Sequence, residues 1–347
     1  IQRGERMKYT NKLKGVLVCF LLVLCAVVPV ACGKDNQKKT DSSSGSAGNS
    51  KGLITVGYVQ SGTGSSWSLA NVESIQQNCT EENGINLIYE CAEDDFDNQL
   101  SIVRSFIEQK VDLISFTPIV SEGWDDVLKD AKEAGIPVII MDRMVETDDD
   151  TLFECWIGSN FLLEGYKAAD WLIEYMKSLN LKKDRYNVAL LQGAIGSSAE
   201  MGRTQGVEEM LNTAGNFKFV YKDTGNFNRD GGIENMQKIL NKKLDIDILI
   251  AENDDMALGA IEVMEKNGIK PGKDIVIVSF DGIHDAFEAM INGKINCVME
   301  CNPLTGKLLA SAVQTVINGD PISKKNYVLE ELFPADTAAD YIDNRKY

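Results

Sequence analysis

Apolar stretches alternate with amphipathic segments along the chain from residue 53 onward. The apolar stretches are short and nearly continuous in Val, Ile and Leu, which is typical of strands covered on both faces of a parallel sheet. They form two series, at residues 53–59, 85–91, 111–118 and 136–142 and then at residues 186–193, 217–223, 247–253, 274–282 and 294–300. Because helical patterns separate these strands, we predict an α/β fold with two doubly wound parallel-sheet domains.

The segments between the strands have the spacing of amphipathic helices. In residues 97–110 the apolar side chains recur at helical spacing, and Asp97 is placed to cap the exposed amides at the start. Similar patterns predict helices near residues 121–135, 162–179 and 303–318. We expect these helices to cover both faces of each sheet.

The first 51 residues do not follow this alternation. From Met7, the expected start, the chain has a basic segment and an apolar run of roughly 15 residues, which predicts a signal peptide over residues 1–31. The run is short for a membrane-spanning helix, which needs about 20 apolar residues. Its end resembles a bacterial lipoprotein cleavage site, so we expect residues 32–51 to form a lipidated Cys32 and a flexible linker. These features predict an extracytoplasmic protein that a lipid anchors to the cell membrane.

Charge and cysteine content narrow the classes of partner. The formal net charge is −17 at pH 7, which argues against a nucleic-acid partner, whose phosphates require a basic face. With a single histidine in the chain, a Cys/His zinc cluster is not expected. The cysteines after Cys32 are odd in number, so at least one thiol is free, and we predict that they act as small buried hydrophobic residues. They are Cys79, Cys91, Cys155, Cys297 and Cys301.

The loop after the first strand, SGTGSSW, tests the hypothesis of a nucleotide enzyme. Ligands of open parallel sheets bind beyond the carboxyl ends of the strands, where this loop would lie. A dinucleotide-binding loop needs the pattern G-x-G-x-x-G, but Gly62 and Gly64 are followed by Trp67 in place of the third glycine. A P-loop needs a lysine, and this loop has none. We therefore predict neither a phosphate site nor a nucleotide cofactor.

Catalytic patterns are equally weak. His284 is the only histidine, no G-x-S-x-G motif is present, and the adjacent carboxylates are better explained as helix caps and solvated faces. No acidic loop has the oxygen spacing that calcium requires. We therefore predict a protein that is not an enzyme and that uses no metal ion or cofactor.

Other residues at the predicted carboxyl ends of the strands combine hydrogen-bonding groups with flat apolar surfaces. The arginines present five donors in a fixed plane, the carboxylates accept hydrogen bonds, and the aromatic rings offer apolar faces. A sugar has the matching duality of hydroxyl groups and an apolar C–H face. The residues are Asp142, Arg143, Arg203, Asn253 and Asp281, with the aromatic residues Trp67, Trp124 and Phe227.

Four sequence blocks carry a resemblance to a known family. DRMV, GAIGSSAEMGRTQG, AENDDMALGAI and VSFDG resemble the sugar-binding proteins of bacterial ABC importers that include the ribose- and galactose-binding proteins. GSSW, SNFLLEG and IKPGKDI are most similar to the galactofuranose-binding branch. The resemblance implies a type I periplasmic-binding-protein fold with a three-crossover hinge near Gly158-Ser159, Glu300-Cys301 and Val328. It implies a first lobe of residues 52–158 plus 301–327 and a second of residues 159–300 plus 328–347.

The resemblance also implies a set of ligand-binding residues between the lobes. Trp67 and Phe227 would stack on the sugar, and hydrogen bonds would come from Asp142, Arg143, Arg203, Asn253, Asp281 and Glu300. The implied function is that of a monomer that captures a monosaccharide, galactofuranose-like or another hexose or pentose, and delivers it to the membrane subunits of an ABC importer. A sugar sensor or chemoreceptor-linked protein, and a secreted carbohydrate-active enzyme, remain alternatives.

Overall fold

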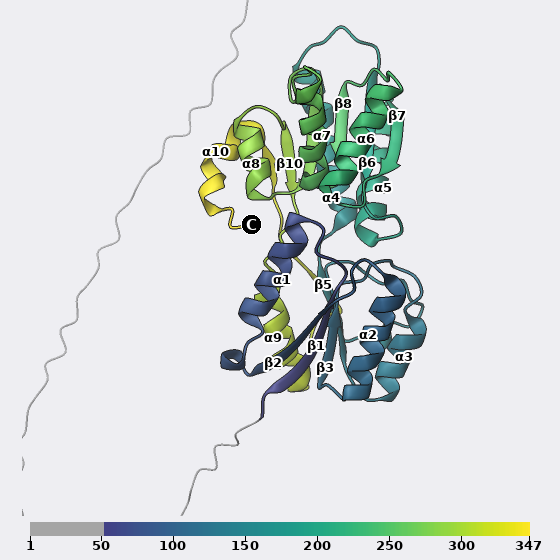
Figure 1. The fold of residues 1–347 in the computed structure, drawn as a ribbon, viewed down its shortest axis with the longest axis vertical. Coiled ribbons are helices and arrows are strands. Elements are labelled where there is room, and N and C mark those ends of the chain that lie inside the picture. The colour runs from purple at the N-terminus through teal and green to yellow at the C-terminus, as the bar shows by residue number, and fades with distance from the viewer. Residues whose placement is uncertain (1–51) are drawn as a thin grey trace, which may run out of the picture. The chain divides into compact units, whose positions relative to one another are not determined.

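Two six-stranded sheets form the framework of residues 52–347, which are the residues that the computed structural model describes (Figure 1). The predicted signal peptide, the lipidated Cys32 and the linker to residue 51 lie outside the described residues. Within residues 52–347, no helix combines the length and the apolar composition that crossing a membrane requires.

The first sheet has the strand order β11-β5-β4-β3-β1-β2, and all of its strand pairs are parallel. Its strands are β1 (Ile54–Gln60), β2 (Ile85–Cys91), β3 (Leu113–Phe116), β4 (Val138–Met141), β5 (Cys155–Gly158) and β11 (Lys325–Tyr327). Helices α1 (Ser66–Asn78) and α9 (Gly306–Ile317) cover one face, and α2 (Phe96–Gln109) and α3 (Asp125–Glu133) cover the other. Two 3-10 turns, η1 (Glu81–Asn83) and η2 (Asp150–Leu152), lie in the connections. We call this the first lobe.

The second sheet repeats the arrangement with the order β12-β10-β9-β8-β6-β7. Its strands are β6 (Tyr186–Gln192), β7 (Phe217–Thr224), β8 (Ile248–Ala251), β9 (Val276–Asp281), β10 (Cys297–Glu300) and β12 (Leu332–Pro334), which is antiparallel to β10. Helices α4 (Phe161–Ser178) and α5 (Ser198–Ala214) cover one face, and α6 (Arg229–Asn241), α7 (Asp254–Lys266) and α8 (His284–Ile291) cover the other. The chain ends with η3 (Ala335–Thr337), α10 (Ala338–Tyr341) and η4 (Ile342–Asn344). We call this the second lobe.

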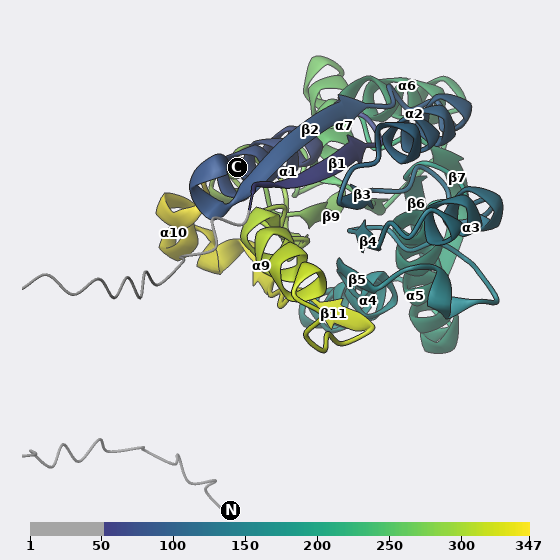
Figure 2. The same ribbon diagram turned by 90° about the horizontal axis from the view of Figure 1, so that it is seen from below.

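The chain passes between the two sheets three times within the described residues. It leaves the first sheet after β5, returns after β10 to form α9 and β11, and leaves again between β11 and β12, so that the late helix α9 lies against the early helix α1 (Figure 2). These connections and the two parallel sheets confirm the predicted α/β fold. In both sheets the strand order reverses beside the first strand, which places a crevice at the carboxyl ends of the strands.

Strand alternation explains how each sheet is buried on both faces. In β1, Tyr58 packs with α1 and α9, whereas the next residue, Val59, packs with α2 and α3, and both side chains are fully buried. Successive side chains of a strand point to opposite faces, so a strand between two helical layers needs apolar residues at every position. Full burial of one such side chain contributes about 1.5–3 kcal/mol to the free energy of unfolding.

Three local predictions were wrong or incomplete. Asp95, not Asp97, caps α2, because its carboxylate accepts a hydrogen bond from Asn98 N at 3.0 Å. The helix expected from Ser121 begins only at Asp125, after a turn in which Gly123 has a φ of +89°. The described cysteines are free, and all but the half-buried Cys91 are buried as predicted.

Candidate ligand-binding site

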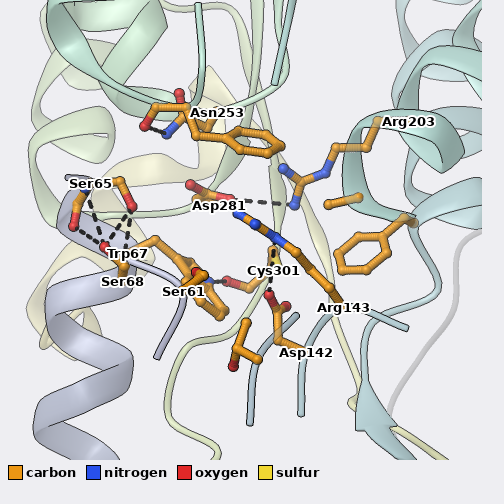
Figure 3. A pocket seen from close by; sticks show the side chains of 14 residues that line it. Ser61, Ser65, Trp67, Ser68, Asp142, Arg143, Arg203, Asn253, Asp281 and Cys301 are labelled. Carbon is orange, nitrogen blue, oxygen red and sulfur yellow. Dashed lines mark hydrogen bonds and ion pairs between the residues drawn. The ribbon is translucent and has the colours of Figure 1, made fainter. Parts of the chain in front are cut away.

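A pocket lies where the carboxyl ends of both sheets face each other (Figure 3). Its inner part has a volume of about 40 Å³. The lining comes from loops after strands of both sheets and from the starts of α1, α4 and α5. The residues are Ser61, Ser65, Trp67, Ser68, Thr117, Asp142, Arg143, Phe161, Ala199, Arg203, Phe227, Asn253, Asp281 and Cys301. Every candidate sugar-binding residue except Glu300 and Trp124 is therefore brought to one place, while their binding roles stay predictions.

Glu300 requires a correction, because its side chain does not line the pocket. Its carboxylate accepts hydrogen bonds from Arg345 Nη1, from the Tyr347 hydroxyl at 3.2 Å and from Glu331 N at 3.1 Å. The Arg345 guanidinium lies over the rings of Phe287 and Phe333. The C-terminal segment thus supplies the cation that neutralises Glu300, and the sequence pattern gave no sign of this long-range contact.

Trp124 also differs from expectation. This residue is fully buried and its ring stacks on Phe116 with centroids 4.2 Å apart, within the core beneath α2 and α3. Its indole Nε1 donates to Val120 O at 2.8 Å. Trp124 therefore contributes to the core of the first lobe and not to the pocket.

Trp67 is held at the start of α1 by local and long-range hydrogen bonds. Ser65 and Ser68 form a capping box, in which each side chain accepts a hydrogen bond from the backbone amide of the other, at 3.1 and 3.2 Å. The indole Nε1 then donates to Cys301 O at 2.7 Å, on the connection that follows β10. The residue is only 9% exposed, so its hydrogen bond and the packing around it fix the orientation of the ring at the pocket.

Phe227 is positioned by unusual backbone geometry. Its φ is +57°, in the left-handed region, and Asn253 Nδ2 donates to its carbonyl oxygen at 2.9 Å. A Cβ atom on Gly193 would lie 1.8 Å from the Phe227 ring, so only glycine allows the ring to occupy this place. Asn253 Oδ1 accepts from Met256 N at 3.0 Å as the cap of α7. Asn253 lines the pocket, but both ends of its side chain already position other groups.

Arg203 uses its donors within the protein. Its Nε donates to Glu164 Oε2 at 2.7 Å, Nη1 donates to Glu252 O, and Nη2 lies 3.4 Å from Asp281 Oδ1. The side chain is 3% exposed, and its guanidinium also lies over the ring of Phe280. A guanidinium held on several sides in this way acts as a fixed part of the pocket wall.

Arg143 makes much weaker contacts. Its Nη1 reaches Pro118 O and Ile119 O only at 3.4 Å, and its buried Nε has no hydrogen-bond partner among the described residues. Its guanidinium lies over the Phe227 ring, 5.2 Å from the centroid. Burial lowers the pKa of Arg143, and the Asp142 carboxylate, 3.9 Å from Nε, opposes this shift. Arg143 therefore has donors that a ligand can satisfy.

Two carboxylates complete the inner pocket. Burial raises the pKa of Asp142 to about 6, although Arg143 and Arg203 both favour its ionised form. Burial also raises the pKa of Asp281 well above its usual range, against the effect of Arg203. Both residues have a positive φ, +57° and +106°, which costs backbone strain in residues other than glycine. Such strain at strand ends that line a pocket is typical of functional sites.

A wider outer part continues from the inner pocket and has a volume of about 590 Å³. The two parts share Ser61, Ser65, Ser68, Arg143 and Phe227. The outer part adds Asp94, which the sequence analysis did not select, and the polar side chains of Thr224, Asn226 and Asn228. A Cβ atom on Gly62 would lie 2.3 Å from a carboxylate oxygen of Asp94, so this glycine permits Asp94 to approach the opening loop.

Several other lining residues were also missed. Ser61, Ser65, Ser68 and Thr117 were not selected from the sequence, and Cys301 was predicted only as a small buried hydrophobic residue, yet they line the pocket. These residues could have been found from their position. A search of every small polar residue in the loops at the carboxyl ends of the strands would have included them.

Hydrogen bonds join the two lobes near the pocket. Ser66 N and Ser66 Oγ donate to the two carboxylate oxygens of Asp255, at 2.6 and 3.0 Å. Met144 N donates to Ser198 Oγ at 2.8 Å, which links the loop after β4 with the start of α5. The structure therefore has its lobes in contact across the pocket.

Comparison with known proteins agrees with this arrangement. The model of the periplasmic binding protein domain matches residues 56–321. The galactofuranose-binding protein YtfQ of Escherichia coli (strain K12) is 34% identical over 297 residues, 84% of this chain and 92% of its own length.

Two solved structures extend the comparison. A Mycobacterium smegmatis protein in complex with β-D-fucofuranose is 39% identical, with a TM-score of 0.82 over 85% of this chain and 96% of its own. The binding component of the arabinose ABC transporter of Shewanella sp. ANA-3, bound to α- and β-L-arabinofuranose, is 36% identical, with a TM-score of 0.79 over 84% and 95% of the two chains. The sequence match, the fold and the pocket between two parallel sheets together show that this chain belongs to the periplasmic binding protein family.

Proposed function

We propose that this protein captures a monosaccharide in its furanose form and delivers it to the membrane subunits of an ABC importer. The observation that carries the proposal is Arg143, whose buried Nε has no hydrogen-bond partner among the described residues and which lines a pocket walled by Trp67 and Phe227. Relatives named for galactofuranose, β-D-fucofuranose and L-arabinofuranose support the choice of ligand class.

The chemistry of the pocket matches both parts of a sugar. Ring hydroxyls can accept hydrogen bonds from Arg143 and donate to Asp142, while the apolar C–H face lies against an aromatic ring. Because Arg143 Nε has no hydrogen-bond partner among the described residues, a ligand hydroxyl would satisfy a group that is otherwise costly to bury. A planar guanidinium also fixes the orientation of adjacent hydroxyls better than an ammonium group would.

Capture requires the lobes to separate. The hydrogen bonds of Ser66 to Asp255 and of Met144 to Ser198 hold the lobes together beside the inner pocket, so a sugar enters this part when these contacts separate. The three connections between the sheets provide the hinge, with the proposed lobes comprising residues 52–158 plus 301–327 and residues 159–300 plus 328–347. A sugar that contacts both lobes would stabilise the closed form, which the importer would then recognise.

The pocket supports binding without chemical conversion. The only histidine, His284, begins α8 and does not line the pocket. The buried carboxylates Asp142 and Asp281 both lie beside arginines and are explained by hydrogen bonding to a bound sugar. We therefore propose that the protein is not an enzyme, and that a sugar incubated with it is recovered unchanged.

We also propose that the protein acts as a monomer and that a lipid on Cys32 anchors it outside the cytoplasm. Mass spectrometry of the N-terminal peptide from bacterial membranes would show diacylglycerol on Cys32. The Cys32→Ala variant should instead be recovered without lipid. An unmodified Cys32 in the membrane fraction would contradict the anchor and leave the sugar site untouched.

The binding proposal is tested by titration calorimetry with D-galactose, D-fucose and L-arabinose, whose solutions contain furanose forms. Methyl β-D-galactopyranoside, locked in the six-membered ring, is the matched control. Binding of at least one reducing sugar without binding of the locked pyranoside is expected. Equal binding of both ring forms would contradict furanose selectivity, and no binding by any of the sugars would contradict the proposed function.

A further inference from the structure

A polar cluster lies where the three connections between the lobes come together. Ser159 follows β5, Cys301 follows β10, and Glu330 lies between β11 and β12. Ser159 Oγ donates to Glu330 Oε1 and lies 3.4 Å from Cys301 Sγ. Asn302 N also donates to Glu330 Oε1, at 3.2 Å. The side chain of Glu330 therefore ties all three connections together.

Glu164 of α4 brings a second carboxyl group to this cluster. Its Oε2 accepts from Arg203 Nε at 2.7 Å, and the side chain is 2% exposed. Its Oε1 is buried and has no hydrogen-bond partner among the described residues. One oxygen of Glu164, one oxygen of Glu330 and Cys301 Sγ all lie within 4.8 Å of one another. The Glu330 carboxyl group can donate to Glu164 only when it carries a proton.

The charges around the cluster favour a single proton on the pair. Arg203 of α5 already contacts Glu164 and Asp281. Lys167 of α4 donates to the backbone oxygen of Glu330 at 3.3 Å, and no ion pair between the Glu330 carboxyl group and a described residue is present. A second charge beside the buried Glu164 is costly, because Arg203 contacts Glu164 and Asp281 but makes no ion pair with the half-buried Glu330.

The remaining groups in the surroundings do not offset this cost. Burial raises the pKa of the Cys301 thiol well above its usual range, so the thiol stays neutral, and Asp142 adds further negative charge beside it. Burial, followed by the charge of Glu164, raises the pKa of Glu330 from 4.5 to about 9. The electrostatics therefore agree with the closeness of the two carboxyl groups, which have oxygens within 4.8 Å of each other.

We propose that the Glu330 carboxyl group keeps its proton and donates it in a hydrogen bond to the unpartnered oxygen of Glu164, and that this carboxyl pair holds Arg203 in the pocket wall and fastens the three connections in the closed arrangement. The proton on Glu330 leaves the charge of Glu164 for Arg203. Opening of the lobes admits water to the base of the pocket, where hydration reduces the cost of a second charge. Loss of the proton therefore favours the open form and weakens sugar binding. The effect on sugar affinity rests on the proposed function, but the effect on stability does not.

The first test needs no sugar. Because the pKa of Glu330 is higher in the folded than in the unfolded chain, the folded chain binds more protons between pH 4.5 and about 9. The contribution of the pair is fully present below pH 4.5 and is lost as the pH rises through about 9, so stability falls over this window. Glu330→Gln keeps a hydrogen-bond donor that cannot titrate, and should remove up to about a tenfold change in the folding constant per pH unit.

Denaturant unfolding at several pH values measures this difference. Glu331→Gln is the matched control, because Glu331 is an exposed neighbour of the same type and its loss should leave the wild-type slope unchanged. Glu252, whose pKa burial raises to about 8, contributes the same background slope to every variant. Parallel slopes for wild type and Glu330→Gln would overturn the proposal.

If Glu330→Gln does not fold, carboxyl NMR of ¹³C-glutamate-labelled wild type decides, with the Glu330 resonance assigned through Glu330→Asp. Titration of Glu330 below pH 6 would then overturn it.

The second test measures sugar affinity with D-galactose, D-fucose and L-arabinose at pH 6, 8 and 9.5. For a sugar that binds, wild-type affinity should fall by up to about tenfold per pH unit on the alkaline side, whereas Glu330→Gln should lose this dependence. Glu164→Gln should bind weakly at every pH, because Arg203 loses its partner. Affinity that falls equally in wild type and Glu330→Gln would overturn the proposal. If no sugar binds at any pH, the proposed function fails, while the unfolding test still decides the carboxyl pair.

A metal ion is the competing occupant of the same three side chains. Unfolding is therefore repeated with EDTA and with added Zn²⁺. Unchanged stability supports a proton on Glu330. A Zn²⁺-dependent stabilisation of wild type that Glu330→Gln lacks would overturn the proposal in favour of a metal site.

Discussion

The two arginines of the pocket come from different lobes and have opposite environments. Arg203 of the second lobe is 3% exposed and donates to Glu164, to Glu252 O and toward Asp281. Arg143 of the first lobe is 15% exposed, and its Nε lies 3.9 Å from Asp142 Oδ2 but has no hydrogen-bond partner among the described residues. The same residue type therefore serves as fixed structure on one side of the pocket and as an unsatisfied donor on the other.

The comparison shows why composition alone does not identify a binding residue. A guanidinium with all its partners in the protein offers a ligand a rigid surface but gains little from binding it. A guanidinium with unused, buried donors gains hydrogen bonds when the ligand arrives. Ligand affinity should therefore depend most directly on Arg143, and stability on Arg203.

The largest expected effect is on stability, from Arg203→Ala. The substitution leaves Glu164 and Asp281 without their cation in a buried environment, and should lower the free energy of unfolding by about 3–5 kcal/mol. Denaturant unfolding measures the loss. Arg104→Ala, at an exposed ion pair, is the control and should change stability by less than about 1 kcal/mol. Equal losses from the two substitutions would contradict the structural role of Arg203.

Arg143→Ala should instead affect binding. Loss of its donors should weaken affinity for a furanose by about 3 kcal/mol, roughly 100-fold in Kd, and leave unfolding nearly unchanged. Titration calorimetry with whichever of D-galactose, D-fucose and L-arabinose binds wild type measures the change. Unchanged affinity would remove Arg143 from the proposed site, and a loss of stability as large as that of Arg203→Ala would end the contrast between the two arginines.

The pH dependence of Asp142 sharpens the comparison, because this residue accompanies Arg143. With the pKa of Asp142 raised from 3.8 to about 6, its carboxylate becomes protonated as the pH falls through 6 and accepts fewer hydrogen bonds. Sugar affinity should then fall by up to about tenfold per pH unit below 6. The pH dependence of the free energy of unfolding has the opposite sign. Because the pKa of Asp142 is raised in the folded state, its contribution to stability is present at low pH and is lost as the pH rises from 3.8 to about 6. Calorimetry from pH 4.5 to 7 should show no acidic decrease for Asp142→Asn.

The smallest effect is expected at the contact between lobes, away from both arginines. Ser66→Ala removes one hydrogen bond to Asp255 and should weaken affinity by about 1 kcal/mol through a less stable closed form. Ser178→Ala, on an exposed hydroxyl of the second lobe, is the control. Stopped-flow measurement should place the Ser66→Ala effect mainly in faster dissociation. A loss as large as that of Arg143→Ala would show that lobe contact, and not Arg143, dominates the affinity.

Much of the fold could be predicted because its signals are local. Continuous apolar runs such as residues 186–193 can be buried on both faces only between helical layers, and the observed β6 spans nearly the same residues. Boundaries were less certain where two similar residues compete. Asp95 and Asp97 are both suited to cap a helix, and only the path of the backbone selects Asp95.

The candidate site was predictable to the extent that it follows strand ends. Asp142, Arg143 and Asp281 lie directly after or at the end of buried strands, and parallel strands bring their carboxyl ends to one edge. Glu300 occupies the same kind of position, but Arg345 and Tyr347, far away in the sequence, direct its carboxylate elsewhere. The direction of a side chain at a strand end depends on partners that no local pattern contains.

The sequence by itself determined the two series of strands, the helices between them and the edge at which polar residues gather, because hydrophobic periodicity is a local property. Only the tertiary structure decided that Arg203 Nε has a hydrogen-bond partner while Arg143 Nε has none among the described residues. It also decided that Ser159, Cys301 and Glu330 meet beside Glu164. These groups come from three separate connections and one helix, and their charges depend on burial, which arises only when the two lobes pack together.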